Sequence, residues 1–175
     1  MMKNILTILT SLTLFICFST NLQAQEDKLK RPSPPAEIRT TIDSADIAIM
    51  YSSPAVKGRQ IWGGLVPYGK VWRTGANEAT IFETNRPLLI KGETLPAGKY
   101  SLFTIPGEQV WTVIFNSEWN QWGAFKYDAA KDVLRIQVPV EKCDPFNERM
   151  KFDIVENNVV LMWENLKVGF PIDPQ

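Results

Sequence analysis

Residues 132–140 read DVLRIQVPV, and apolar and polar side chains alternate along this stretch. Leu134, Ile136 and Val138 share one face, while Arg135 and Gln137 take the other. Strict alternation with a period of two predicts a half-buried β-strand. The same pattern recurs along most of the chain. It predicts strands near residues 37–42, 46–51, 79–84, 88–90, 98–105, 110–116, 132–140, 150–155, 158–165 and 167–170.

Turn-forming residues separate these predicted strands, for example at 43–46, 96–98, 106–108 and 156–158. The 12 Pro and 10 Gly interrupt every candidate long helix, and only residues 124–131 have the composition for a helical turn. Many short, regularly spaced strands are typical of a β-sandwich or a related barrel. We therefore expect an all-β fold: an antiparallel β-sandwich, with a jelly-roll-like arrangement or a partly closed barrel as alternatives.

The composition of the 175-residue chain excludes several classes of protein. It is 45% hydrophobic, so it can form a core and is not expected to be disordered. Its 19 basic and 19 acidic residues cancel, which argues against a nucleic-acid binder. The chain has no His, which removes the commonest general base and most zinc and copper sites.

Residues 1–24 have the pattern of a secretory signal. Lys3 precedes an apolar run over residues 5–18, and Ala24 ends a short polar stretch that suits cleavage. A membrane anchor would need a longer apolar run, and a lipoprotein would need a small residue before Cys17. We expect a signal peptide at 1–24, a flexible leader at 25–35, a single domain at 36–175, and a periplasmic or secreted location.

Removal of the signal would leave Cys143 as the one cysteine of the exported protein. With no His to lower its pKa, we expect a small buried residue rather than a reactive thiol.

The alternation breaks over residues 53–80, and such a break points to function. This stretch holds five of the ten glycines, two tryptophans, a tyrosine and several cations. A connection of this length within one domain is usually either functional or wrongly assigned. The predicted ligand-binding residues are Arg59, Trp62, Tyr68, Lys70, Trp72, Arg73, Asn77 and Glu78. A second break, at 116–128, adds Trp119 and Trp122.

These residue types suit a site for a small molecule or a glycan. Aromatic faces beside planar donors can hold a sugar ring, a heterocycle or a carboxylate-bearing molecule, and Arg59 or Arg73 can clamp an anionic group. A structural interpretation competes with this one. In it, Trp62 and Trp72 belong to the core, Arg73 and Glu78 form an ion pair, and residues 116–128 fold over the end of the core.

Several separated motifs, in order, resemble one family of exported bacterial proteins. They are YSSP (51–54), GGLVPYGK (63–70), VWRTGANEAT (71–80), LPAGKYSLFTIP (95–106) and WTVIFN (111–116). The family is filed as domain of unknown function 2911, and the resemblance runs from about Pro34 to the C-terminus. It implies a secreted or periplasmic all-β protein of Gram-negative bacteria. It implies no catalytic residues, because the family has no assigned activity.

The leading hypothesis is a non-catalytic binding module. The alternative is a His-free hydrolase of envelope or extracellular glycans that uses two carboxylates, with Glu78, Glu83 and Asp128 as candidates. A third hypothesis is docking on a protein partner through an edge strand. We expect no cofactor, no nucleic acid and no metal, since Asp43 and Asp46 alone supply too few oxygens for calcium.

Overall fold

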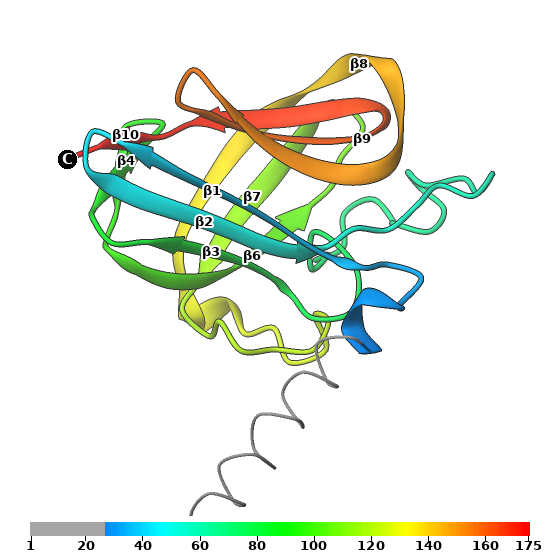
Figure 1. Cartoon of the computed structure of the whole chain (residues 1–175), viewed down its shortest axis with the longest axis horizontal. Helices are drawn as coiled ribbons and strands as arrows, with labels where there is room; N and C mark the ends of the chain where they lie inside the picture. Colours follow the sequence, from blue (N-terminus) through cyan, green and yellow to red (C-terminus); the bar gives the residue numbers. More distant parts are fainter. Residues whose placement is uncertain (1–26) are drawn as a thin grey trace, which may run out of the picture.

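The computed structural model describes residues 27–175, which fold almost entirely into antiparallel β-structure (Figure 1). The strands are β1 (Pro35–Ile42), β2 (Ala45–Ser52), β3 (Thr80–Thr84), β4 (Leu88–Ile90), β5 (Glu93–Leu95), β6 (Gly98–Ile105), β7 (Val110–Asn116), β8 (Asp132–Val155), β9 (Asn158–Pro171) and β10 (Asp173–Pro174). The expected signal peptide, residues 1–24, lies outside the described residues. Within residues 27–175, no helix has the length and apolar character needed to span a membrane.

Seven strands form one curled sheet in the order β1-β2-β3-β6-β7-β8-β9, which gives the molecule the shape of a half-barrel (Figure 1). A second, small sheet has the order β10-β4-β5, so that the C-terminal strand pairs with the hairpin that connects β3 to β6. The all-β antiparallel prediction is confirmed, in a form nearest to its partly closed barrel alternative.

Two long strands differ from the prediction. The sequence indicates separate strands at 132–140 and 150–155, but β8 is continuous across them. It also indicates separate strands at 158–165 and 167–170, but β9 is continuous from Asn158 to Pro171. The register of β8 against β9 shifts twice, between Lys142 and Asn147 and between Asn147 and Lys151. Such irregular pairing removes the alternation of side chains while the strand continues. The helical turn expected at 124–131 shrinks to the 3-10 helix Ala129–Lys131.

The inner face of the half-barrel carries the core. The strands of the large sheet contribute alternate residues to it, as in Trp111, Val113 and Phe115 of β7. Large aromatic side chains bury the most apolar area, and Trp111 and Trp163 are both fully buried. Cys143 lies outside this core and is half-buried.

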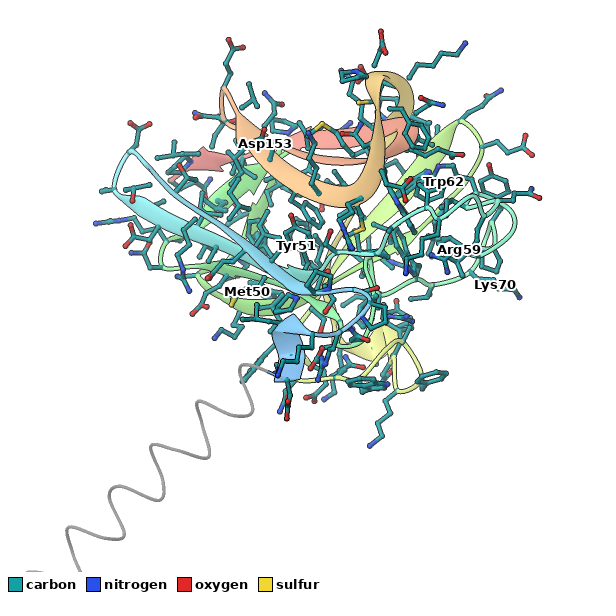
Figure 2. The ribbon with its side chains drawn as sticks, turned by 45° about the vertical axis from the view of Figure 1, so that its right-hand side comes forward. Met50, Tyr51, Arg59, Trp62, Lys70 and Asp153 are labelled. Carbon is teal, nitrogen blue, oxygen red and sulfur yellow. The ribbon has the colours of Figure 1, made fainter. Side chains whose placement is uncertain are left out.

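Residues 53–79, which we name the crossing segment, close one end of the half-barrel. Near its start, the N–H of Met150 in β8 donates to the carbonyl of Pro54 at 2.9 Å. Near its end, Trp72 and Thr104 of β6 exchange two backbone hydrogen bonds of 2.7 and 2.9 Å. Figure 2 shows Arg59, Trp62 and Lys70 on this segment, at one side of the molecule. The segment thus contacts β8 near its start and β6 near its end, two strands that flank β7 in the sheet.

Residues 117–128, which we name the outer loop, cover the outer face of β6 and β7. Ala124 and Tyr127 pack there against Phe103 and Ile114, in a small apolar cluster separate from the main core. Backbone hydrogen bonds tie the outer loop to the crossing segment, because the N–H of Gly123 donates to the carbonyl of Asn77 at 3.0 Å. The two segments singled out by the broken alternation therefore meet in space.

Candidate functional site

Four tryptophans gather where the crossing segment enters the half-barrel. Trp62 and Trp72 come from the crossing segment, Trp111 from β7 and Trp163 from β9. The ring of Trp62 lies edge-on to the other three, with centroid distances of 6.0, 4.9 and 5.6 Å to Trp72, Trp111 and Trp163. Edge-to-face and offset-stacked rings are favourable arrangements. The cluster anchors the crossing segment on the core.

The indole N–H groups of this cluster are mostly without acceptors. Trp72 Nε1 donates to the carbonyl of Gly75 at 3.1 Å. The Nε1 atoms of Trp62, Trp111 and Trp163 are buried and have no hydrogen-bond acceptor among the described residues. Buried donors are normally paired, so each of these needs an explanation. Among the described residues, the region therefore has more buried indole donors than acceptors for them.

A cavity of about 250 Å³ opens beside the cluster, and we name it the arginine pocket. The crossing segment supplies most of its wall, and β9 supplies Trp163. Residues 27–34, which precede β1 and which we name the N-terminal segment, supply Ser33. Its lining residues are Ser33, Pro54, Arg59, Leu65, Val66, Trp72, Arg73, Gly75, Ala76 and Trp163. Within the described chain, its lining includes two arginines and no carboxylate.

Arg73 is the cation of this pocket that lacks a partner. Its side chain is half-buried, and its Nε atom is buried without a hydrogen bond. No described residue forms an ion pair with its guanidinium. Burial lowers the pKa of Arg73, because removal from water disfavours the charged form. An uncompensated cation of this kind favours an anionic ligand.

Arg59, by contrast, is held by the protein. Its Nε donates to the carbonyl of Val56 at 3.0 Å, and its Nη2 donates to the carbonyl of Ala55. These bonds fix the guanidinium on the pocket wall. Arg59 therefore supplies positive charge at a fixed place, while Arg73 has free hydrogen-bonding capacity.

The backbone next to Arg73 adopts an uncommon conformation. Thr74 has a φ of 54°, which is rare for a β-branched residue. Its buried hydroxyl lies 3.1 Å from that of Thr104, and the hydroxyl of Thr80 donates to its carbonyl at 2.7 Å. Strained residues persist only where surrounding contacts hold them, and they concentrate at functional sites. These bonds hold the turn that presents Arg73.

Asn77 and Glu78 contact the N-terminal segment instead of Arg73. Asn77 Nδ2 donates to the carbonyl of Ser33 at 3.1 Å. Arg31 Nη1 donates to both carboxylate oxygens of Glu78, at 3.0 and 2.9 Å, and Lys28 lies 3.5 Å away. The Arg73–Glu78 ion pair of the structural interpretation is therefore wrong, because Glu78 pairs with Arg31 and Lys28.

The pKa of Glu78 lies below its ordinary value. Burial raises it, but hydrogen bonds from the residue's own backbone N–H and from Arg31, together with the charges of Arg31 and Lys28, outweigh that effect. Glu78 is therefore held in its ionised form.

The remaining sequence-predicted residues lie apart from the arginine pocket. Tyr68 and Lys70 are exposed at the tip of the crossing segment. Trp119 and Trp122 are exposed on the outer loop, each near a cation, Lys99 and Arg31 respectively. The structure thus brings Arg59, Trp72 and Arg73 together and separates the others, apart from Trp62, which joins the tryptophan cluster.

The candidate catalytic carboxylates each have a structural partner. Glu83 lies 3.1 Å from Lys99 across neighbouring strands. Asp128 caps the 3-10 helix by accepting from the N–H of Ala130 at 2.9 Å. Within residues 27–175, no group of three or more metal-ligating side chains lies close enough to hold a metal ion.

Two residues of the pocket lie outside the stretches that the sequence analysis singled out. Trp163 lies in a regular alternating stretch that indicates a core strand, and no local signal pairs it with Trp72. Ser33 lies in the proline-rich stretch that predicts an extended leader, where no periodicity indicates contact with the domain.

The comparisons with known proteins identify one family. A family model described as "Protein of unknown function (DUF2911)" matches residues 33–172. The matched range includes every residue that lines the arginine pocket. Searches of curated proteins and of solved structures each gave no significant match.

Proposed function

The chain belongs to the DUF2911 family, whose description assigns no function, and from the site geometry we propose that the arginine pocket binds a small carboxylate-bearing molecule. Binding, rather than chemical conversion, is the role proposed. The observation that carries the proposal is Arg73, a half-buried guanidinium that has no partner among residues 27–175, in a cavity whose described lining contains no carboxylate.

A carboxylate suits this guanidinium for geometric reasons. The planar fork of an arginine matches the two oxygens of a carboxylate, and such charge-assisted hydrogen bonds are about twice as strong as neutral ones. Arg59 adds positive charge without competing for the ligand, because two of its donors already serve backbone carbonyls. A phosphate dianion normally takes several arginines or a nest of backbone N–H groups.

The rest of the pocket suits an apolar body. Trp72 and Trp163 supply aromatic walls, and Leu65 and Val66 supply aliphatic ones. Small-molecule sites typically combine such walls with a few placed polar groups. The proposed ligand therefore has one carboxylate attached to a compact apolar or ring-shaped body.

The proposal includes export. The signal pattern over residues 1–24 supports removal of that segment and action in the periplasm or the medium. The ligand would then be a molecule present outside the cytoplasm.

The hydrolase alternative has no comparable support. A glycosidase acid must remain protonated near neutral pH, which requires an apolar surrounding or a neighbouring negative charge. Glu78 instead has a lowered pKa beside Arg31 and Lys28, Glu83 forms an ion pair with Lys99, and Asp128 caps a helix.

Thermal unfolding tests the proposal with pairs of compounds that differ only in charge. Small aromatic and aliphatic carboxylates are compared with their neutral amides on the wild-type protein, on Arg73→Gln and on Arg135→Gln, a control at an exposed arginine elsewhere. We expect some carboxylates, and not their amides, to raise the melting temperature of wild type and Arg135→Gln. Equal shifts in Arg73→Gln would contradict the proposal.

A further inference from the structure

We infer that the outer face of the sheet carries a second binding site, which takes a neutral saccharide chain. The site is a trough over β1, β2 and β3, bordered by the outer loop and by the N-terminal segment. It shares no lining residue with the arginine pocket, so either site can exist without the other.

The first part of the trough follows from strand register. Arg39, Ala48, Glu83 and Lys99 are paired in succession across β1, β2, β3 and β6. Paired residues in neighbouring strands project from the same face of the sheet. The short side chain of Ala48 lies between two long ones, and a hollow of about 540 Å³ opens there.

The second part lies one row further along the same face. Met50, labelled in Figure 2, is two residues beyond Ala48 and pairs with Ile81 of β3. Residues two apart on a strand share a face. A hollow of about 170 Å³ lies here, lined by Met50 and Ile81 and bounded by Arg31 and Glu78. The two hollows are therefore neighbours along the strands, and together they form the outer trough.

The charges of the outer trough are matched within the protein. Glu83 pairs with Lys99 at 3.1 Å, and Glu78 pairs with Arg31 at 2.9 Å. The side chain of Arg39 pairs with that of Glu37. Asp46, which also lines the first hollow, accepts hydrogen bonds from Thr41 and Asn85 at 2.8 and 2.9 Å. Because these charges are paired or hydrogen-bonded within the protein, the trough offers donors and acceptors without a strong attraction for ions. A neutral ligand rich in hydroxyl groups can pair with these donors and acceptors without carrying a charge. An anionic polymer or lipid surface, in contrast, requires excess positive charge.

An exposed indole ring stands beside each hollow. Trp119 is 42% exposed, and its ring centroid lies 4.9 Å from Nζ of Lys99, which lines the first hollow. Trp122 is 58% exposed, with its centroid 5.9 Å from Cζ of Arg31, which lines the second. An aromatic ring offers a large, rigid apolar face next to polar groups. Two such rings at successive hollows fit a chain of linked sugar rings better than a single small molecule.

The test is a titration with neutral cello-oligosaccharides and chito-oligosaccharides, followed by intrinsic tryptophan fluorescence and by calorimetry. The variants are the double variant Trp119→Ala/Trp122→Ala and, as a matched control, Phe125→Ala on the same loop, whose side chain is 85% exposed. A third variant, Ala48→Gln, fills the first hollow and leaves both indoles in place.

We expect wild type and Phe125→Ala to bind at least one of these saccharides equally well. We expect the double variant and Ala48→Gln each to weaken binding by roughly tenfold or more. Failure of wild type to bind any of them overturns the inference, as does unchanged binding by Ala48→Gln. Tighter binding of anionic polysaccharides or of anionic phospholipid vesicles overturns it too. Arg73→Gln should leave saccharide binding unchanged, which separates this site from the arginine pocket.

Discussion

The indole rings of Trp72 and Trp163 lie 18° from parallel, with their centroids 6.0 Å apart. Trp72 belongs to the crossing segment and Trp163 to β9, an edge strand of the large sheet. Their contact therefore joins the crossing segment, which closes the half-barrel, to the edge strand β9. Both rings line the arginine pocket, so the same contact stabilises the fold and forms a wall of the site.

Loss of this contact should be costly. Trp163→Ala removes a fully buried ring, and we expect the free energy of unfolding to fall by about 3–5 kcal/mol. Urea denaturation measures the change. The control, Trp122→Ala, removes an exposed ring and should change stability by no more than about 0.5 kcal/mol. Similar effects of the two substitutions would contradict the assignment of Trp163 to the core.

Removal of the charge of Arg73 should stabilise the ligand-free protein. Arg73→Met keeps much of the side-chain volume and removes a half-buried cation that has no partner in the described part of the chain. We expect the free energy of unfolding to rise by about 1 kcal/mol, measured by chemical denaturation. Arg149 is the matched control, because its guanidinium donates to the carbonyl of Ser53 at 3.0 Å. Arg149→Met should destabilise the protein. A marked loss of stability in Arg73→Met would mean that Arg73 has a structural role.

The buried hydroxyl of Thr74 should matter for both stability and binding. Thr74→Val preserves the shape of the side chain but removes the hydrogen bond to Thr104, and we expect a loss of about 1–2 kcal/mol. Because this bond supports the turn that presents Arg73, carboxylate binding should weaken as well. Denaturation and ligand titration of the same variant check the two effects. Full affinity in a destabilised variant would show that the turn does not position Arg73.

The Glu78–Arg31 ion pair should make stability depend on pH. The folded pKa of Glu78 lies below the unfolded value of about 4.3, so the pair contributes fully only above that value. The contribution is lost as the pH falls through the folded pKa. Glu78→Gln should therefore lower stability by about 0.5–1 kcal/mol at neutral pH, since the pair is partly exposed.

Unfolding of Glu78→Gln and wild type, measured from neutral pH to progressively lower pH, tests this directly. The difference between them should shrink as the pH falls through the folded pKa of Glu78, because the protonated carboxyl is then uncharged like the glutamine amide. A difference that is independent of pH would indicate that shape, rather than charge, is what Glu78 contributes.

The sequence predicts the strands well because burial of one sheet face imposes a period of two. Residues 98–105 and 110–116 were predicted with the bounds of β6 and β7. The pattern fails for residues 141–149, where bulged pairing with β9 exposes most side chains although the backbone stays in the sheet. Alternation in the sequence depends on which side chains are buried, and it gives no information about backbone pairing.

The candidate site was predicted in part. The abundance of Gly, Trp and Arg in the crossing segment correctly indicated an unusual connection, and Arg59 and Arg73 do line one pocket. The separation of Glu78 from Arg73 was not predictable, because its partners Lys28 and Arg31 lie in a polar stretch without any structural signal. Contacts between residues so distant in sequence depend on the closed fold rather than on local pattern.

The most direct test of the central claim is isothermal titration calorimetry of the carboxylate that stabilises the protein most, on wild type and on Arg73→Gln. The account predicts one ligand per wild-type chain and a loss of affinity of about 10- to 100-fold in Arg73→Gln, as expected when a charged hydrogen bond is removed. Equal affinity for the two proteins, together with no competition from other carboxylates, would contradict the claim that Arg73 holds the ligand.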